Sequence, residues 1–176
     1  MPRTVQRPIL AQPDARALLA ATRVDPLLHA AVSVMLMAGL RPTEAARLTV
    51  ADYAPGDEPR LRVVGGRHIQ IARSAAVAMD AYLASQEAEP GEPLLLGLQE
   101  NLPQLVRRAA EQVGVQAGVH SLRRAAIAAA LEDNPPHSHI EAYFGINKAL
   151  DRKALTPLPE GYDAGMAATL EAAFGF

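Results

Sequence analysis

The segment 119–131 limits the possible folds of this chain more than any other. After its first turn the segment is apolar almost all round, which is typical of a helix buried in a protein core. The first turn carries His120, Arg123 and Arg124, and the first two share one helix face. Arginines at the positive end of a helix are favourable when an anion binds there, because guanidinium groups and first-turn amides would both contact it. The same residues also fit a helix start whose arginines are solvated.

The composition favours a helical protein of the cytoplasm. Hydrophobic residues make up 49% of the 176 residues and aromatic residues only 4%, so the core is built mainly from Ala, Leu and Val. There is no cysteine, and residues 1–13 lack the apolar region of a signal peptide. The apolar stretch 27–40 is too short for a membrane span and contains His29. We therefore expect a cytoplasmic protein without disulfides and without a membrane partner.

The charge pattern neither requires nor excludes a nucleic-acid partner. The net charge of −2 provides no overall attraction to DNA. The basic residues are almost all arginine, the exceptions being Lys148 and Lys153. Arginine makes bidentate contacts with phosphate, although a GC-rich genome would produce the same bias. The pair His137 and His139 lacks a third ligand in a suggestive position, so we expect no metal site.

Periodicity and turn residues predict a fold that is mainly α with one small antiparallel β-hairpin, in a single domain over residues 1–176. Residues 60–64 and 67–71 alternate polar and apolar around Gly65-Gly66, which predicts a hairpin with a two-residue turn. Ser74 is the expected cap of the helix that follows. Helices are expected over 15–22, 26–38, 74–86, 102–113, 119–131, 138–144 and 164–174, with a short one after Pro42.

The last segment, 163–176, is predicted to be a helix with an apolar stripe. The stripe consists of Met166, Leu170 and Phe174. It could pack on this chain or, in trans, on a second copy or another protein.

A second cluster of polar residues follows the apolar stretch 27–40. The segment 39–48 reads Gly-Leu-Arg-Pro-Thr-Glu-Ala-Ala-Arg-Leu, with Arg41 just before a new helix and Glu44 in its first turn. Glu44 is a natural partner to orient Arg41. Taken alone, the two residues fit an ordinary Arg–Glu pair between helices.

Read in order, the two clusters resemble the catalytic domain of the tyrosine recombinases, or phage integrases. That family has a "GLR-x-x-E-x-x-x-L" box, then a hairpin, then an "H-x-L-R" box, and the resemblance covers roughly residues 7–176. It implies a mainly helical fold with a small sheet. It also implies a double-stranded DNA partner and a reaction that needs no metal and no cofactor.

The resemblance implies a role for each matching residue. Arg41 and Arg123 would hold the non-bridging oxygens of a scissile DNA phosphate, where phosphoryl transfer builds up charge. His120 would donate or accept a proton at the same phosphate. Glu44 would orient Arg41.

Three positions depart from the family pattern. The family hairpin carries a lysine that protonates the leaving hydroxyl, but here no lysine precedes Lys148. Ile146 stands where the family has a second His or Trp. The nucleophilic tyrosine is expected near Ala154 or Leu155, and Tyr162 is the only tyrosine downstream of that place. Tyr162 is therefore the candidate nucleophile, unless the nucleophile has been lost.

Three further residues are expected near DNA. Arg67 and His68 lie on the predicted hairpin, and Arg124 follows the second box. A guanidinium holds its proton too tightly for Arg67 to replace the lysine as a general acid. By contrast, Arg107 and Arg108 are expected on a solvated helix face, and Tyr143 in the core.

Three hypotheses remain open, and the sequence does not decide whether the protein is an enzyme. It could be a DNA-binding regulator or accessory of recombination that kept the phosphate pocket but is impaired in cleavage. It could be an active minimal recombinase that cleaves and rejoins DNA through Tyr162, as in the integration of a mobile element. It could also be an interaction partner of a recombinase that does not bind DNA. The family's N-terminal core-binding domain is not expected before this region, so DNA binding should be weak and salt-sensitive unless the chain oligomerises.

Overall fold

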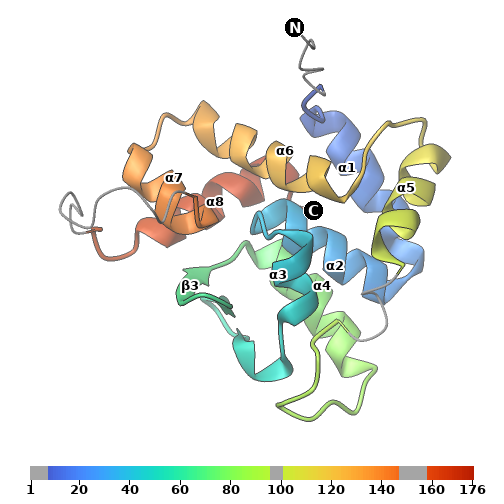
Figure 1. Cartoon of the computed structure of the whole chain (residues 1–176), viewed down its shortest axis with the longest axis horizontal. Coiled ribbons are helices and arrows are strands. Elements are labelled where there is room, and N and C mark those ends of the chain that lie inside the picture. The colour runs from blue at the N-terminus through green and yellow to red at the C-terminus, as the bar shows by residue number, and fades with distance from the viewer. Residues whose placement is uncertain (1–7, 96–100, 147–157) are drawn as a thin grey trace, which may run out of the picture.

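The computed structural model describes residues 8–95, 101–146 and 158–176 and consists of helices around one small sheet (Figure 1). Lys148, Lys153, Ala154 and Leu155 lie outside these ranges. The elements are α1 (Gln12–Ala21), η1 (Thr22–Val24), α2 (Pro26–Met37), α3 (Pro42–Arg47), η2 (Val50–Asp52), β1 (Tyr53–Ala54), β2 (Arg60–Val63), β3 (Arg67–Gln70), α4 (Arg73–Ala84), α5 (Leu102–Gln112), α6 (Val119–Glu132), α7 (His137–Phe144) and α8 (Tyr162–Phe174). The strands form an antiparallel sheet in the order β1-β2-β3. The predicted fold class is confirmed.

Helix α2 forms the centre of the core. Asp25 caps its start, because the carboxylate accepts hydrogen bonds from the N–H groups of Leu27 (3.1 Å) and Leu28 (3.3 Å). Every residue from 30 to 40 is buried. Helices α1, α3, α4, α5, α6 and α8 all contact α2, and Figure 1 shows them arranged around it. Within the described residues, no helix has the length and hydrophobicity needed to cross a membrane.

The β2–β3 turn is longer than predicted. Val63 pairs with Arg67, so the turn contains Val64, Gly65 and Gly66 instead of Gly65-Gly66 alone. Both glycines have positive φ, +103° and +93°, which other residues rarely adopt. Because a shift of one residue moves a side chain to the other face of a sheet, this register places Arg67 on the buried face with Val63.

The predicted cap of α4 is wrong. Ala72 precedes the helix, and Ser74 is its second residue and is buried. The N–H of Ser74 donates to the carboxylate of Glu171 on α8 at 2.8 Å, and the Ser74 hydroxyl donates to the same carboxylate. An acidic side chain from a distant helix therefore caps the amide groups at the start of α4.

The apolar stripe of α8 is buried within this chain. Met166, Leu170 and Phe174 are 3%, 0% and 1% exposed. Helix α8 contacts α2, α6, α7 and β3, and it lies beside α7 and α6 in Figure 1. The stripe is therefore not a free surface on which a second chain could pack.

Candidate functional site

Arg41 lies between the buried helix α2 and the first turn of α3. Leu40 before it is fully buried, and the extended backbone of Arg41 (φ −68°, ψ 151°) turns the chain into α3. Glu44 reaches back one turn, so that its carboxylate accepts hydrogen bonds from the Arg41 N–H and from Arg41 Nη1, both at 2.8 Å. Arg41 Nη2 donates to the carbonyl oxygen of Gly145 at 3.2 Å. The Arg41 side chain remains 42% exposed, so its guanidinium group is accessible from solvent.

Arg123 is the fifth residue of α6 and is held at the ends of two other helices. Its Nη1 donates to the carbonyl oxygen of Gly39 (2.7 Å) and its Nη2 to that of Phe144 (2.8 Å). These carbonyls lie at the C-terminal ends of α2 and α7, where helices carry partial negative charge and unpaired oxygens. Burial and then the nearby charge of Arg41 lower the pKa of Arg123 to about 10, so the group stays charged at neutral pH.

Consecutive carbonyls join the two arginines in one site. Phe144 accepts from Arg123, and the next residue, Gly145, accepts from Arg41. Gly145 ends α7 with φ +67°, a left-handed conformation that turns the chain out of the helix. Arg41, Glu44 and Arg123, which the sequence predicted to act together, are therefore adjacent.

Arg67 belongs to the same cluster and is buried. Its predicted contact with DNA would require a side chain at the surface. Its side chain is 6% exposed, and its Nη1 and Nη2 donate to the two oxygens of Glu44 at 2.9 and 3.2 Å. Burial by itself would raise the pKa of Glu44, but the hydrogen bonds from Arg67 and from the Arg41 backbone lower it to about 2. Glu44 therefore orients two arginines, of which the sequence analysis identified only Arg41.

His68, His120 and Arg124 lie outside this buried cluster. His68 is exposed on β3, on the face opposite Arg67, as the alternation of the strand predicted. His120 is exposed in the first turn of α6, and its carbonyl oxygen accepts a hydrogen bond from Nε of the half-buried Arg124 at 3.4 Å. The structure leaves the His68 and His120 rings open to solvent, and their contact with DNA stays a prediction.

Tyr162 is the first residue of α8 and is partly buried. Its ring packs edge-on against His139, with 5.5 Å between ring centroids. Burial and the neighbouring Asp163 raise the pKa of its hydroxyl, against the opposing charges of Arg67 and Arg60. Among the residues that the structure describes, no hydrogen bond joins this hydroxyl to Arg41, His120 or Arg123.

Two neighbouring residues have structural roles. Tyr143 is fully buried and donates to the carbonyl oxygen of Gln70 at 2.7 Å, so its predicted place in the core is confirmed. Ile146 packs against the core and donates its N–H to the carbonyl oxygen of Glu141 at 3.0 Å. An isoleucine side chain cannot donate a hydrogen bond to a phosphate.

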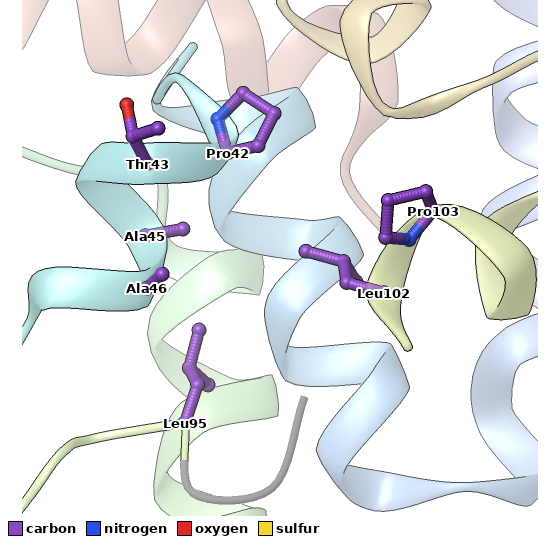
Figure 2. Close-up of a pocket in the computed structure, with 7 residues that line it drawn as sticks. All are labelled: Pro42, Thr43, Ala45, Ala46, Leu95, Leu102 and Pro103. Atoms are coloured by element: carbon purple, nitrogen blue, oxygen red, sulfur yellow. The ribbon is translucent and has the colours of Figure 1, made fainter. Parts of the chain in front are cut away.

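An apolar hollow of about 150 Å³ lies beside α3, as Figure 2 shows. Its lining contains no charged side chain: Pro42, Thr43, Ala45, Ala46, Leu95, Leu102 and Pro103. Such a lining suits apolar atoms and not a phosphate. Within the described ranges, no group of three or more His, Asp or Glu side chains could hold a metal ion.

Comparison with solved structures identifies the fold. XerA recombinase is 20% identical to this chain with a TM-score of 0.69, over 96% of this chain and 65% of that chain. The integrase from mycobacterium phage Brujita is 19% identical with a TM-score of 0.73, over 100% of this chain and 61% of that one. The lambda integrase catalytic core is 17% identical with a TM-score of 0.61, over 83% of this chain and 95% of that core. No protein-family model and no curated protein matches the chain.

This chain therefore has the fold of the tyrosine recombinases, and its resemblance to them is confirmed at the level of the fold. It spans less than two thirds of the XerA and Brujita chains and nearly all of the lambda catalytic core.

Proposed function

We propose that this chain binds double-stranded DNA by holding a backbone phosphate between Arg41 and Arg123. It acts as a regulator or accessory of DNA recombination and is impaired in strand cleavage. The observation that carries this proposal is the attachment of both guanidinium groups to the consecutive carbonyls of Phe144 and Gly145. Two arginines fixed side by side can present paired N–H donors to the oxygens of one phosphate.

The charge of the cluster supports an anionic ligand. Arg41, Arg67 and Arg123 carry three positive charges and Glu44 one negative charge, which leaves a net charge of +2. The charges of Arg41 and Arg67 disfavour the charged form of Arg123, and the opposite charge of Glu44 offsets them only in part, so some repulsion remains in the free site. A phosphate would relieve that repulsion. DNA-bound neighbours of the same fold include XerH recombinase with its difH substrate and a lambda integrase dimer with a COC′ core site.

Impaired cleavage is supported by the groups around the site. Arg67, the basic residue next to the hairpin turn, is buried against a carboxylate and holds its proton too tightly to act as a general acid. Burial and Asp163 raise the pKa of Tyr162, which makes its nucleophilic phenolate form harder to reach than in an ordinary tyrosine.

One assay separates binding from cleavage. The protein is incubated with a nicked suicide duplex that carries the sequence flanking its gene, and gel shift and covalent adduct are measured in the same samples. We expect a gel shift that Arg41→Met and Arg123→Met weaken, and no covalent adduct. Arg107→Met is the control, because Arg107 is an exposed arginine on α5.

Two results would change the proposal. An adduct that Tyr162→Phe abolishes would establish the active recombinase instead. The absence of any gel shift at low salt would contradict DNA binding and favour the interaction partner.

A further inference from the structure

We propose that Arg67 is a positioning residue of the phosphate site. It holds Glu44 so that Arg41 presents its free N–H groups to DNA, and it does not contact the DNA itself. This inference rests on the proposed function, because it assigns a role within the same site.

The Glu44 carboxylate is hydrogen-bonded by both Arg41 and Arg67. Oε1 accepts from Arg41 Nη1 (2.8 Å) and Arg67 Nη1 (2.9 Å), and Oε2 accepts from the Arg41 N–H (2.8 Å) and Arg67 Nη2 (3.2 Å). Each carboxylate oxygen is therefore shared between the two arginines. Since Arg67 bonds both oxygens with its planar fork, it fixes the rotation of the carboxylate and hence the direction from which Arg41 is held.

Arg67 is far more buried than Arg41. The side chain of Arg67 is 6% exposed, whereas that of Arg41 is 42% exposed. Gly145 covers Arg67 so closely that a Cβ atom there would collide with Arg67 Nη1. The same Gly145 accepts a hydrogen bond from Arg41 through its carbonyl oxygen. Arg67 thus lies on the inner side of this chain segment, out of reach of a phosphate that Arg41 can contact.

Among the described residues, Glu44 is the only hydrogen-bond partner of the Arg67 guanidinium. Nε of Arg67 is buried and has no hydrogen-bond partner among the described residues, while Nη1 and Nη2 both donate to Glu44. Neither a lysine nor a methionine can make this paired contact. The geometry therefore uses a property that is specific to arginine.

The salt dependence of DNA binding distinguishes a positioning residue from a contacting one. Loss of a residue that contacts phosphate lowers the slope of log affinity against log salt by about 1. Binding of a 20–30-base-pair duplex is measured by fluorescence anisotropy at several salt concentrations. For Arg67→Met we expect an affinity loss of about tenfold with an unchanged slope, because Arg41 still pairs with the phosphate but is held in a poorer geometry, and Arg67 itself made no phosphate contact. For Arg123→Met the slope itself should fall by about 1.

A second measurement does not depend on DNA. The pKa of Glu44, about 2 in the wild type, is measured from its carboxyl carbon by NMR and should rise in Arg67→Met. If Arg67→Met does not fold, Arg67→Met/Glu44→Gln removes both buried charges. It should bind DNA no more weakly than Glu44→Gln alone, because both residues act through the same contact with Arg41.

The outcomes separate this inference from the proposed function. A slope that falls by about 1 in Arg67→Met would make Arg67 a DNA contact and overturn the inference. Wild-type affinity in Arg67→Met, or a double variant weaker than Glu44→Gln, would also overturn it. If the wild type itself binds no duplex at low salt, the proposed function fails, and the positioning role fails with it.

Discussion

Replacing Gly145 with alanine should damage the site in a way that a matched substitution does not. Gly145 has φ +67°, and an added Cβ would collide with the guanidinium of Arg67. Gly114, which follows α5, has φ +70°, but a Cβ there would meet nothing within 4 Å. The two glycines have nearly the same positive φ near a helix end and differ in the space around them.

The expected losses of unfolding free energy follow from these two environments. Alanine in the left-handed region costs roughly 1–2 kcal/mol, which is the whole effect expected for Gly114→Ala. In Gly145→Ala, Arg67 must also move away from Glu44, and losing hydrogen bonds between charged groups costs about 1.5–3 kcal/mol more. We therefore expect a total of about 2.5–5 kcal/mol for Gly145→Ala.

Urea unfolding followed by circular dichroism measures both losses, provided that the denaturant dependence is the same in the two variants. DNA affinity is measured on the same samples and should fall only in Gly145→Ala. Equal destabilisation of the two variants, together with unchanged DNA affinity in both, would refute the close approach of Gly145 to Arg67.

Three further predictions concern ion pairs and caps. Because the pKa of folded Glu44 is depressed to about 2, its charge stabilises the fold above the unfolded pKa of about 4.3, and this stability is lost as the pH falls towards 2. The difference in unfolding free energy between wild type and Glu44→Gln should therefore shrink from at most about 3 kcal/mol at pH 5 towards zero at pH 2, as urea titrations at each pH would detect. Glu171→Ala should destabilise the protein by about 1 kcal/mol because it uncaps Ser74, and an undiminished melting temperature would contradict that cap. Asp163 is buried and pairs with Arg60 at 2.7 Å, so Asp163→Asn should cost about 1–3 kcal/mol by urea unfolding, and no loss would show that the pair is unimportant.

The features that depend on local sequence could be predicted. The helix around the apolar stretch 27–40 and the helix from residue 119 follow from continuous hydrophobicity and from their end signals. The contact of Arg41 with Glu44 also follows, because residues three apart at a helix start lie within reach of each other.

The burial of Arg67 has a signal in the local sequence. Ile69 and Ile71 alternate towards the core, and the same alternation places Arg67 on their face of the strand. The predicted two-residue turn would pair Arg67 with the exposed Val64, whereas the observed three-residue turn pairs it with the buried Val63. An arginine on a buried face indicates a buried carboxylate partner.

Other contacts of the site depend on how distant helices pack. The carbonyls of Gly39 and Phe144 accept from Arg123 only because the ends of α2 and α7 meet beside the N-terminal part of α6. Similarly, Glu171 reaches Ser74 from a helix 97 residues away in sequence. A single sequence contains no periodic signal for such pairings, because they follow from tertiary packing and not from spacing along the chain.

The salt dependence of DNA binding by the double variant Arg41→Met/Arg123→Met tests the central claim most directly. If both arginines hold phosphate, the slope of log affinity against log salt should fall by about 2 relative to the wild type. The control Arg107→Met/Arg108→Met removes the same net charge from an exposed helix and should keep the wild-type slope. A wild-type slope in Arg41→Met/Arg123→Met would contradict a phosphate site between these two residues.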